Sequence, residues 1–217
     1  MTSNKRFKLL VFDWDGTLAD SEACIVDAMQ LASTEAGLTE CSKAQVRDVI
    51  GLSLEGAIEL LFPDADKKVK KQIADRYREY YFSTSTTTVP VFEGVVDTLE
   101  KLNQENYFLA VATGKSRKGL DRSLRETGLA KYFHTTRCAD ESISKPDPQM
   151  LIEIIEFFGL EAPDTLMIGD SEYDLKMANN AGAHAVAVSY GVHDANRLQQ
   201  CAPLGVIHHI TELSDFL

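Results

Sequence analysis

The second half of the chain alternates short apolar segments with segments of helical periodicity. Apolar segments lie at 108–112, 133–139, 165–168, 185–188 and 206–207. Helical patterns separate them at about 94–104, up to 128, and at 148–158 and 173–180. Strands that alternate with helices pair in parallel, in a sheet covered on both faces. The pattern therefore predicts an α/β fold with a Rossmann-like parallel sheet, which a first apolar segment at 7–12 joins.

A long helical stretch separates this first strand from the rest of the sheet. From Asp20-Ser21-Glu22 onward the pattern stays helical for some 60 residues. A polar run at 83–88 and Val89-Pro90 then mark a connection between two bodies. We expect residues 1–19 and 89–217 to form the core and residues 20–88 to form an inserted, all-helical domain.

Net charge and hydropathy limit the kinds of molecule that the protein is expected to bind. The 22 basic and 33 acidic residues give a formal net charge of -11, which repels phosphate backbones and anionic lipid. No segment approaches the roughly 18 uncharged apolar residues of a membrane span, and the apolar run after the N-terminus is shorter than that of a signal peptide. We expect a soluble cytoplasmic protein, monomeric or weakly dimeric, without nucleic-acid or membrane partners.

The four cysteines lie far apart in the sequence, at Cys24, Cys41, Cys138 and Cys201. They form no Cys-x-x-Cys pair, so neither a disulfide framework nor a structural zinc site is indicated. Buried thiols of a reducing compartment are the expectation.

Polar residues follow several of the predicted strands at the point where each strand ends. Asp13 and Asp15 follow the first, Thr113-Gly114-Lys115 the second, and Gly169-Asp170-Ser171 the fourth. Asp174 comes one helical turn later, and Lys145-Pro146 lies in the loop after the third strand. Since ligands of open parallel sheets bind beyond the carboxyl ends of the strands, these side chains are expected to converge.

Four aspartates packed at one edge of a sheet would repel one another. A hard divalent cation with oxygen ligands relieves that repulsion, and Mg²⁺ fits such a ligand set. The sequence therefore predicts a Mg²⁺ site at this edge.

The same residues carry a resemblance to a known family. Asp13-Trp14-Asp15-Gly16-Thr17-Leu18, Thr113-Gly114, Lys145-Pro146 and Gly169-Asp170-Ser171-x-x-Asp174 resemble, in order, the four motifs of the haloacid dehalogenase superfamily. The helical insertion resembles the α-helical cap of its phosphoglycolate phosphatases and β-phosphoglucomutases. Trp14 departs from the pattern, because relatives more often carry Phe, Leu or Met there.

This resemblance implies a role for each motif residue. Asp13 would attack phosphorus and form a phosphoaspartyl intermediate, and Asp15 would protonate the leaving oxygen and later deprotonate water. Mg²⁺ would be held by the Asp13 carboxylate, the Asp15 backbone carbonyl and Asp170, with Asp174 as an outer-shell partner. The site for the other phosphoryl oxygens would comprise the Trp14 backbone, Thr113, Gly114 and Lys145.

The expected activity is hydrolysis of a small phosphorylated metabolite, with phosphoglycolate as the default substrate. Asp15 argues against dehalogenation, because a halide leaves without a proton. A phosphomutase is a second interpretation, since Gly51-Leu52-Ser53 resembles a mutase cap loop. Leu54, where such mutases carry a cation, favours a substrate with one phosphate instead.

A third interpretation comes from outside the enzymes. A phospho-receiver-like regulator would also combine a parallel sheet, an acidic pocket and a lysine. The large insertion and Asp15 oppose this interpretation, because Asp15 would hasten hydrolysis of the acyl phosphate that a receiver must preserve.

Overall fold

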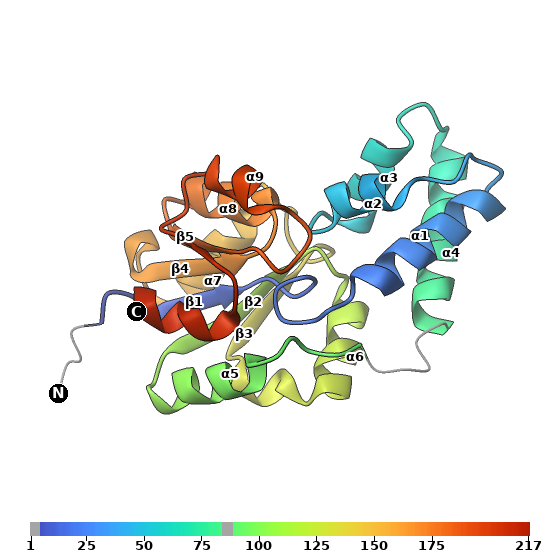
Figure 1. Ribbon diagram of the computed structural model, residues 1–217. Coiled ribbons are helices and arrows are strands. Elements are labelled where there is room, and N and C mark those ends of the chain that lie inside the picture. The colour runs from blue at the N-terminus through green and yellow to red at the C-terminus, as the bar shows by residue number, and fades with distance from the viewer. Residues whose placement is uncertain (1–4, 84–88) are drawn as a thin grey trace.

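The computed structural model describes residues 5–83 and 89–217. Its centre is a sheet of six parallel strands in the order β3-β2-β1-β4-β5-β6 (Figure 1). The strands are β1 Leu9–Phe12, β2 Phe108–Thr113, β3 Thr135–Cys138, β4 Thr165–Gly169, β5 His184–Val188 and β6 Val206–Ile207. The predicted α/β class and parallel sheet are confirmed.

The strand register brings the predicted site residues to one edge. Leu9 of β1 pairs with Phe108 of β2 on one side and with Thr165 of β4 on the other. The chain builds the sheet outward from β1 to β3 on one side, then returns to β4 and builds the other side. The switch point thus lies between β1 and β4, and their carboxyl ends are where such a sheet binds ligands.

Alternating side chains of the strands feed two hydrophobic clusters, one on each face of the sheet. Leu10 and Phe12 of β1 join one cluster, whereas Leu9 and Val11 join the other. The first face is covered by α5 Val95–Gln104, α6 Arg117–Thr127 and the 3-10 helices Leu129–Tyr132 and Ile210–Phe216. The second is covered by α7 Gln149–Phe158, α8 Glu172–Ala181 and α9 Ala195–Gln199, with the 3-10 helix Ala162–Asp164 beside it.

Four of these elements were not predicted from the sequence: α9 and the 3-10 helices Leu129–Tyr132, Ala162–Asp164 and Ile210–Phe216. Five residues are too few for a helical period to show in α9. Its start is fixed instead by Asp194, whose side chain accepts hydrogen bonds from the backbone N–H groups of Asn196 and Arg197.

The helices that follow β1 pack around a hydrophobic cluster of their own, beyond one end of the sheet (Figure 1). They are α1 Glu22–Glu35, α2 Lys43–Val49, α3 Leu54–Leu61 and α4 Lys67–Ser83, and we call them the cap. Ser42 and Ser53 start α2 and α3 by accepting a backbone hydrogen bond. We propose that residues 20–88 form the inserted domain. The predicted connection covers residues 83–88. Of these, Ser83 belongs to the described residues and 84–88 lie outside them.

All four cysteines are free thiols. Cys41 and Cys138 are buried, Cys201 is half-buried and Cys24 is exposed, so the expectation of buried thiols is wrong for Cys24 and only partly met by Cys201. Cys24 belongs to α1 of the cap, and the spacing of the cysteines alone does not reveal its exposure. Across the described residues, no helix has the length and apolar character needed to span a bilayer.

Candidate active site

The loop after β1 presents Asp13 and Asp15 at the edge of the sheet. The backbone N–H of Asp13 donates to the Ile168 carbonyl at 2.9 Å, which ties the loop to β4. Gly16 has a φ of +82°, and a Cβ there would lie 2.1 Å from Asp170 Oδ2. A residue with a side chain would therefore displace Asp170, so the close approach of the two loops requires glycine.

Three buried carboxylates meet at this edge. Asp13, Asp170 and Asp174 each offer an oxygen, and these oxygens lie within 4.8 Å of one another. The Lys145 ammonium lies 2.6 Å from Asp13 Oδ1 and 2.5 Å from Asp174 Oδ1. The structure thus brings together four of the residues singled out in the sequence, from three separate segments.

Neighbouring groups hold two of the three carboxylates in place. Asp170 accepts hydrogen bonds from the Thr17 hydroxyl at 2.9 Å and the Val192 backbone N–H at 2.8 Å. Asp174 Oδ2 accepts from the backbone N–H and hydroxyl of Ser171. Asp13 Oδ2, by contrast, is buried without a hydrogen-bond partner among the described residues.

The cluster carries more negative charge than its one lysine balances. Burial raises the pKa of Asp13 well above its ordinary value, and the charges of Asp174 and Asp170 raise it further against the opposing effect of Lys145. Burial and the charge of Asp174 raise the pKa of Asp170 to about 7. Burial lowers the pKa of Lys145, but Asp13 and Asp174 outweigh it, so that pKa lies above its ordinary value. Without a bound cation, ionisation of Asp13 and Asp170 is therefore disfavoured.

These residues fit a divalent cation. The three buried carboxylates, each with one oxygen within 4.8 Å of the others, supply the hard oxygen donors that Mg²⁺ binds. A bound cation would also offset the charge that Lys145 leaves unbalanced.

Backbone N–H groups beside the cluster are free to bind an anion. Those of Trp14, Asp15 and Gly114 donate no hydrogen bond to any residue in the described part of the chain. Thr113 is buried next to them, and its hydroxyl accepts from the Lys115 backbone N–H at 3.2 Å. The Trp14 side chain points into the core, where its ring meets Phe133 edge to face.

Asp15 lies outside the carboxylate cluster and has partners of its own. Its carboxylate accepts from the Ser21 hydroxyl at 2.5 Å and from Lys115 Nζ at 2.8 and 2.9 Å. Lys115 also donates to the Tyr81 hydroxyl of α4, at 2.8 Å. The position of Lys115 directly after Thr113-Gly114 predicts its place at this edge, but its pairing with Asp15 was not predicted.

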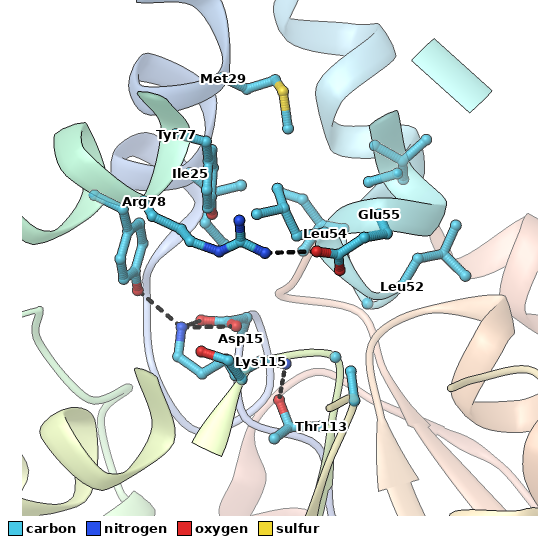
Figure 2. A pocket seen from close by; sticks show the side chains of 18 of the residues that line it. Asp15, Ile25, Met29, Leu52, Leu54, Glu55, Tyr77, Arg78, Thr113 and Lys115 are labelled. Carbon is cyan, nitrogen blue, oxygen red and sulfur yellow. Dashed lines mark hydrogen bonds and ion pairs between the residues drawn. The ribbon is translucent and has the colours of Figure 1, made fainter. Parts of the chain in front are cut away.

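A cavity of about 600 Å³ lies between this edge and the cap. Asp13, Asp15, Thr113 and Gly114 line it on the core side. A Cβ on Gly114 would lie 2.3 Å from the Leu52 carbonyl oxygen, so the cap loop rests directly on the core backbone. Figure 2 shows Ile25, Met29, Leu54 and Tyr77 of the cap on its other walls.

Comparison with known proteins agrees with these motifs. The model of the haloacid dehalogenase-like hydrolase family matches residues 10–188. The "Probable phosphatase IndB" of Dickeya dadantii is 33% identical over 94% of this chain and 91% of its own. The phosphoglycolate phosphatase of Vibrio cholerae is 30% identical over 92% of each chain.

Solved structures share the whole fold. A predicted phosphoglycolate phosphatase from Haemophilus somnus superposes with a TM-score of 0.87 at 23% identity, over 99% of each chain. A hydrolase from Pseudomonas syringae gives a TM-score of 0.88 at 23% identity, over 96% of this chain and 97% of its own. The four motifs, the fold and these relatives show that the chain belongs to the haloacid dehalogenase-like hydrolase family and is a phosphatase that resembles those called phosphoglycolate phosphatases.

Proposed function

We propose that this phosphatase hydrolyses a small phosphomonoester through a phosphoaspartyl intermediate on Asp13, with Mg²⁺ as cofactor. The observation that carries the proposal is the Asp13 carboxylate: Oδ1 is held by Lys145, while Oδ2 is buried and has no hydrogen-bond partner in the described structure. Lys145 fixes the carboxylate group through Oδ1. Because Oδ2 accepts no hydrogen bond from the described part of the chain, its lone pairs are free for nucleophilic attack.

The reaction takes two displacements at phosphorus. Asp13 Oδ2 attacks phosphorus, and the bond from phosphorus to the alcohol oxygen breaks. Water then attacks the phosphoaspartate, which releases inorganic phosphate and restores the carboxylate. Asp15 gives a proton to the departing alcohol oxygen and takes one from the attacking water.

The remaining residues position the phosphoryl group and offset its charge. We assign the phosphoryl oxygens to the free N–H groups of Trp14, Asp15 and Gly114, to the Thr113 hydroxyl and to Lys145, which contacts Asp13. Asp13, Asp170 and the Asp15 carbonyl would hold Mg²⁺, with Asp174 behind them. When bound, Mg²⁺ supplies electrostatic stabilisation of the phosphoryl oxygens, which is the larger part of catalysis in phosphoryl transfer.

The cap argues for one phosphate in the substrate. Leu54 lines the cavity. The resemblance of Gly51-Leu52-Ser53 to the cap loop of phosphomutases implies that a mutase would carry a cation at this position to hold a second phosphate. Phosphoglycolate is the reference substrate, because several relatives are named phosphoglycolate phosphatase.

The test is phosphate release from a panel of phosphomonoesters, with Mg²⁺ and with chelator, for the natural chain and for Asp13→Asn. We expect Mg²⁺-dependent turnover that Asp13→Asn lowers at least about 10³-fold, as expected on loss of a nucleophile. Asp27→Asn, an exposed aspartate of the cap, is the matched control and keeps full activity. Turnover that survives Asp13→Asn contradicts the proposal.

A further inference from the structure

The cavity over the nucleophile is wide and largely apolar. Its volume of about 600 Å³ lies within the range of pockets that enclose whole small molecules. Ile25 and Met29 of α1, Val46 of α2 and Leu54 of α3 form much of its cap side. Such walls stabilise apolar surface on a ligand, whereas the leaving group of phosphoglycolate has two carbons and offers almost none.

The charges that line the cavity are poorly suited to a second anionic group on the substrate. Beyond Asp13, the described lining residues include four carboxylates, Asp15, Glu55, Glu79 and Asp140, and three cations, Arg78, Lys115 and Lys118. The region above the cluster thus has no excess of positive charge.

Two of the three cations are already engaged by carboxylates. Lys115 is paired with Asp15, and Arg78 is 2.5 Å from Glu55 and 3.4 Å from Asp75. Figure 2 shows the Arg78–Glu55 pair bridging the cavity between α4 and α3. Lys118 is exposed, with its ammonium 5.0 Å from the Phe82 ring. A carboxylate entering this space would lose water and compete with existing ion pairs, so an uncharged leaving group is favoured.

Two tyrosines supply a flat wall and one unused polar group. The rings of Tyr77 and Tyr81 are stacked, with centroids 5.7 Å apart at 17°. Tyr81 is engaged by Lys115, but the Tyr77 hydroxyl has no hydrogen-bond partner in the described structure. Tyr77 extends from α4 toward the Lys115–Asp15 pair (Figure 2). Its hydroxyl is therefore available to a polar group on a ligand ring.

From this geometry we infer that the substrate is the phosphate monoester of an uncharged, ring-containing alcohol, with the ring against the cap and a polar ring substituent at Tyr77. Nucleoside 5′-monophosphates are examples of this class. Hydrolysis adds water to phosphorus and breaks its bond to the alcohol oxygen, giving the free alcohol and inorganic phosphate. The inference rests on the proposed phosphatase chemistry and specifies its substrate class.

The first experiment compares kcat/KM for phenyl phosphate, a pyrimidine nucleoside 5′-monophosphate, phosphoglycolate and acetyl phosphate. We expect the nucleotide to exceed phosphoglycolate at least about 10-fold, since a site rejects a group whose charge it leaves unpaired. Phosphoglycolate as the equal or better substrate overturns the inference. Acetyl phosphate separates the two proposals. If the protein cleaves acetyl phosphate and Asp13 is required, the phosphatase mechanism stands even when the substrate class is wrong. If it does not cleave acetyl phosphate, the phosphatase mechanism itself is contradicted.

The second experiment places bulk in the cavity. Leu54→Trp is expected to lower the ratio of kcat/KM for phenyl phosphate to that for acetyl phosphate at least about 10-fold, because the indole takes the ring's space. Leu60→Trp is the matched control: Leu60 belongs to the same helix, is 60% exposed and does not line the cavity, so the ratio should not move. A ratio that Leu54→Trp leaves unchanged overturns the inference.

The third experiment removes only the Tyr77 hydroxyl. Tyr77→Phe is expected to lower the ratio of kcat/KM for the nucleotide to that for phenyl phosphate about 3- to 10-fold, the value of one hydrogen bond between uncharged groups. Phenyl phosphate carries no ring substituent, so the ratio isolates the hydroxyl. An unchanged ratio overturns the assignment of Tyr77.

Discussion

Lys115 Nζ lies between both carboxylate oxygens of Asp15, at 2.8 and 2.9 Å, and reaches across to the Tyr81 hydroxyl of the cap. The pair is almost wholly buried, with side-chain exposures of 7% for Lys115 and 11% for Asp15. One lysine of the core thus contacts both the proposed proton-transfer residue and the helix that closes over it.

Lys115→Met is expected to lower the free energy of unfolding by about 3 kcal/mol, because it leaves the Asp15 carboxylate buried without its counter-charge. Urea denaturation measures this. Lys118→Met, an exposed lysine three residues on, should change it by less than about 0.5 kcal/mol. Equal stability of the two variants would show that the Asp15 charge is balanced elsewhere.

Lys145→Met removes the one ammonium that contacts the carboxylate cluster in the described structure. In chelator, its free energy of unfolding should fall by about 3–5 kcal/mol, the cost of breaking a buried pair. Mg²⁺ should restore part of the loss, since a divalent cation offsets the same carboxylates. Lys176→Met removes an exposed pair with Glu172 and should cost less than about 1 kcal/mol. A Lys145→Met loss no greater than that would contradict the charge balance described here.

Mg²⁺ should stabilise the protein more at pH 8 than at pH 6. The pKa of Asp170 is about 7 in the folded chain and 3.8 for a free aspartate. A raised pKa means that, without metal, the folded state holds a proton which the unfolded state has lost. Stability from this group is therefore full below about pH 4 and is lost as pH rises through 7. Mg²⁺ relieves the repulsion among the ionised carboxylates, so its effect grows over the same range.

The measurement is the shift in melting temperature between Mg²⁺ and chelator at each pH. At about 100 times its Kd, Mg²⁺ contributes about 2.7 kcal/mol. Because both samples share one pH, titration elsewhere cancels. Asp170→Asn should abolish most of the shift, and Asp64→Asn, exposed in the cap, should preserve it. A shift that is equal at both pH values would place the metal away from Asp170.

Gly114→Ala is expected to reduce kcat/KM at least about 10-fold, since its Cβ would lie 2.3 Å from the Leu52 carbonyl oxygen and force the cap loop off the core. Steady-state kinetics with any accepted ester measures this. Gly119→Ala is the control, because its Cβ would meet Ser116 Oγ at 3.4 Å and Lys115 Cβ at 3.9 Å, which are ordinary contacts, and a helical alanine is favourable. If the two variants are equally active, the Gly51–Leu52 loop is not required to contact the core during turnover.

Much of the fold could be predicted because its signals are local. Apolar runs at β1, β2, β4 and β5, and the helical periods between them, predict a parallel sheet covered on both faces. Parallel pairing in turn places Asp13, Thr113 and Asp170 at one edge, since each follows a strand. The five-residue helix α9 escaped prediction because so few residues show no helical period.

The sequence by itself determined the strand-and-helix order, the parallel sheet and the edge at which the four motifs meet, because periodicity and strand ends fix these without knowledge of side-chain direction. Only the tertiary structure decided which groups face one another there. The burial of Lys115 against Asp15 and Tyr81, the unpartnered Asp13 Oδ2 and the apolar cavity with its free Tyr77 hydroxyl all depend on how the cap rests on the core. Contacts between Tyr81 and Lys115 span 34 residues and two bodies, and no local pattern specifies such a pairing.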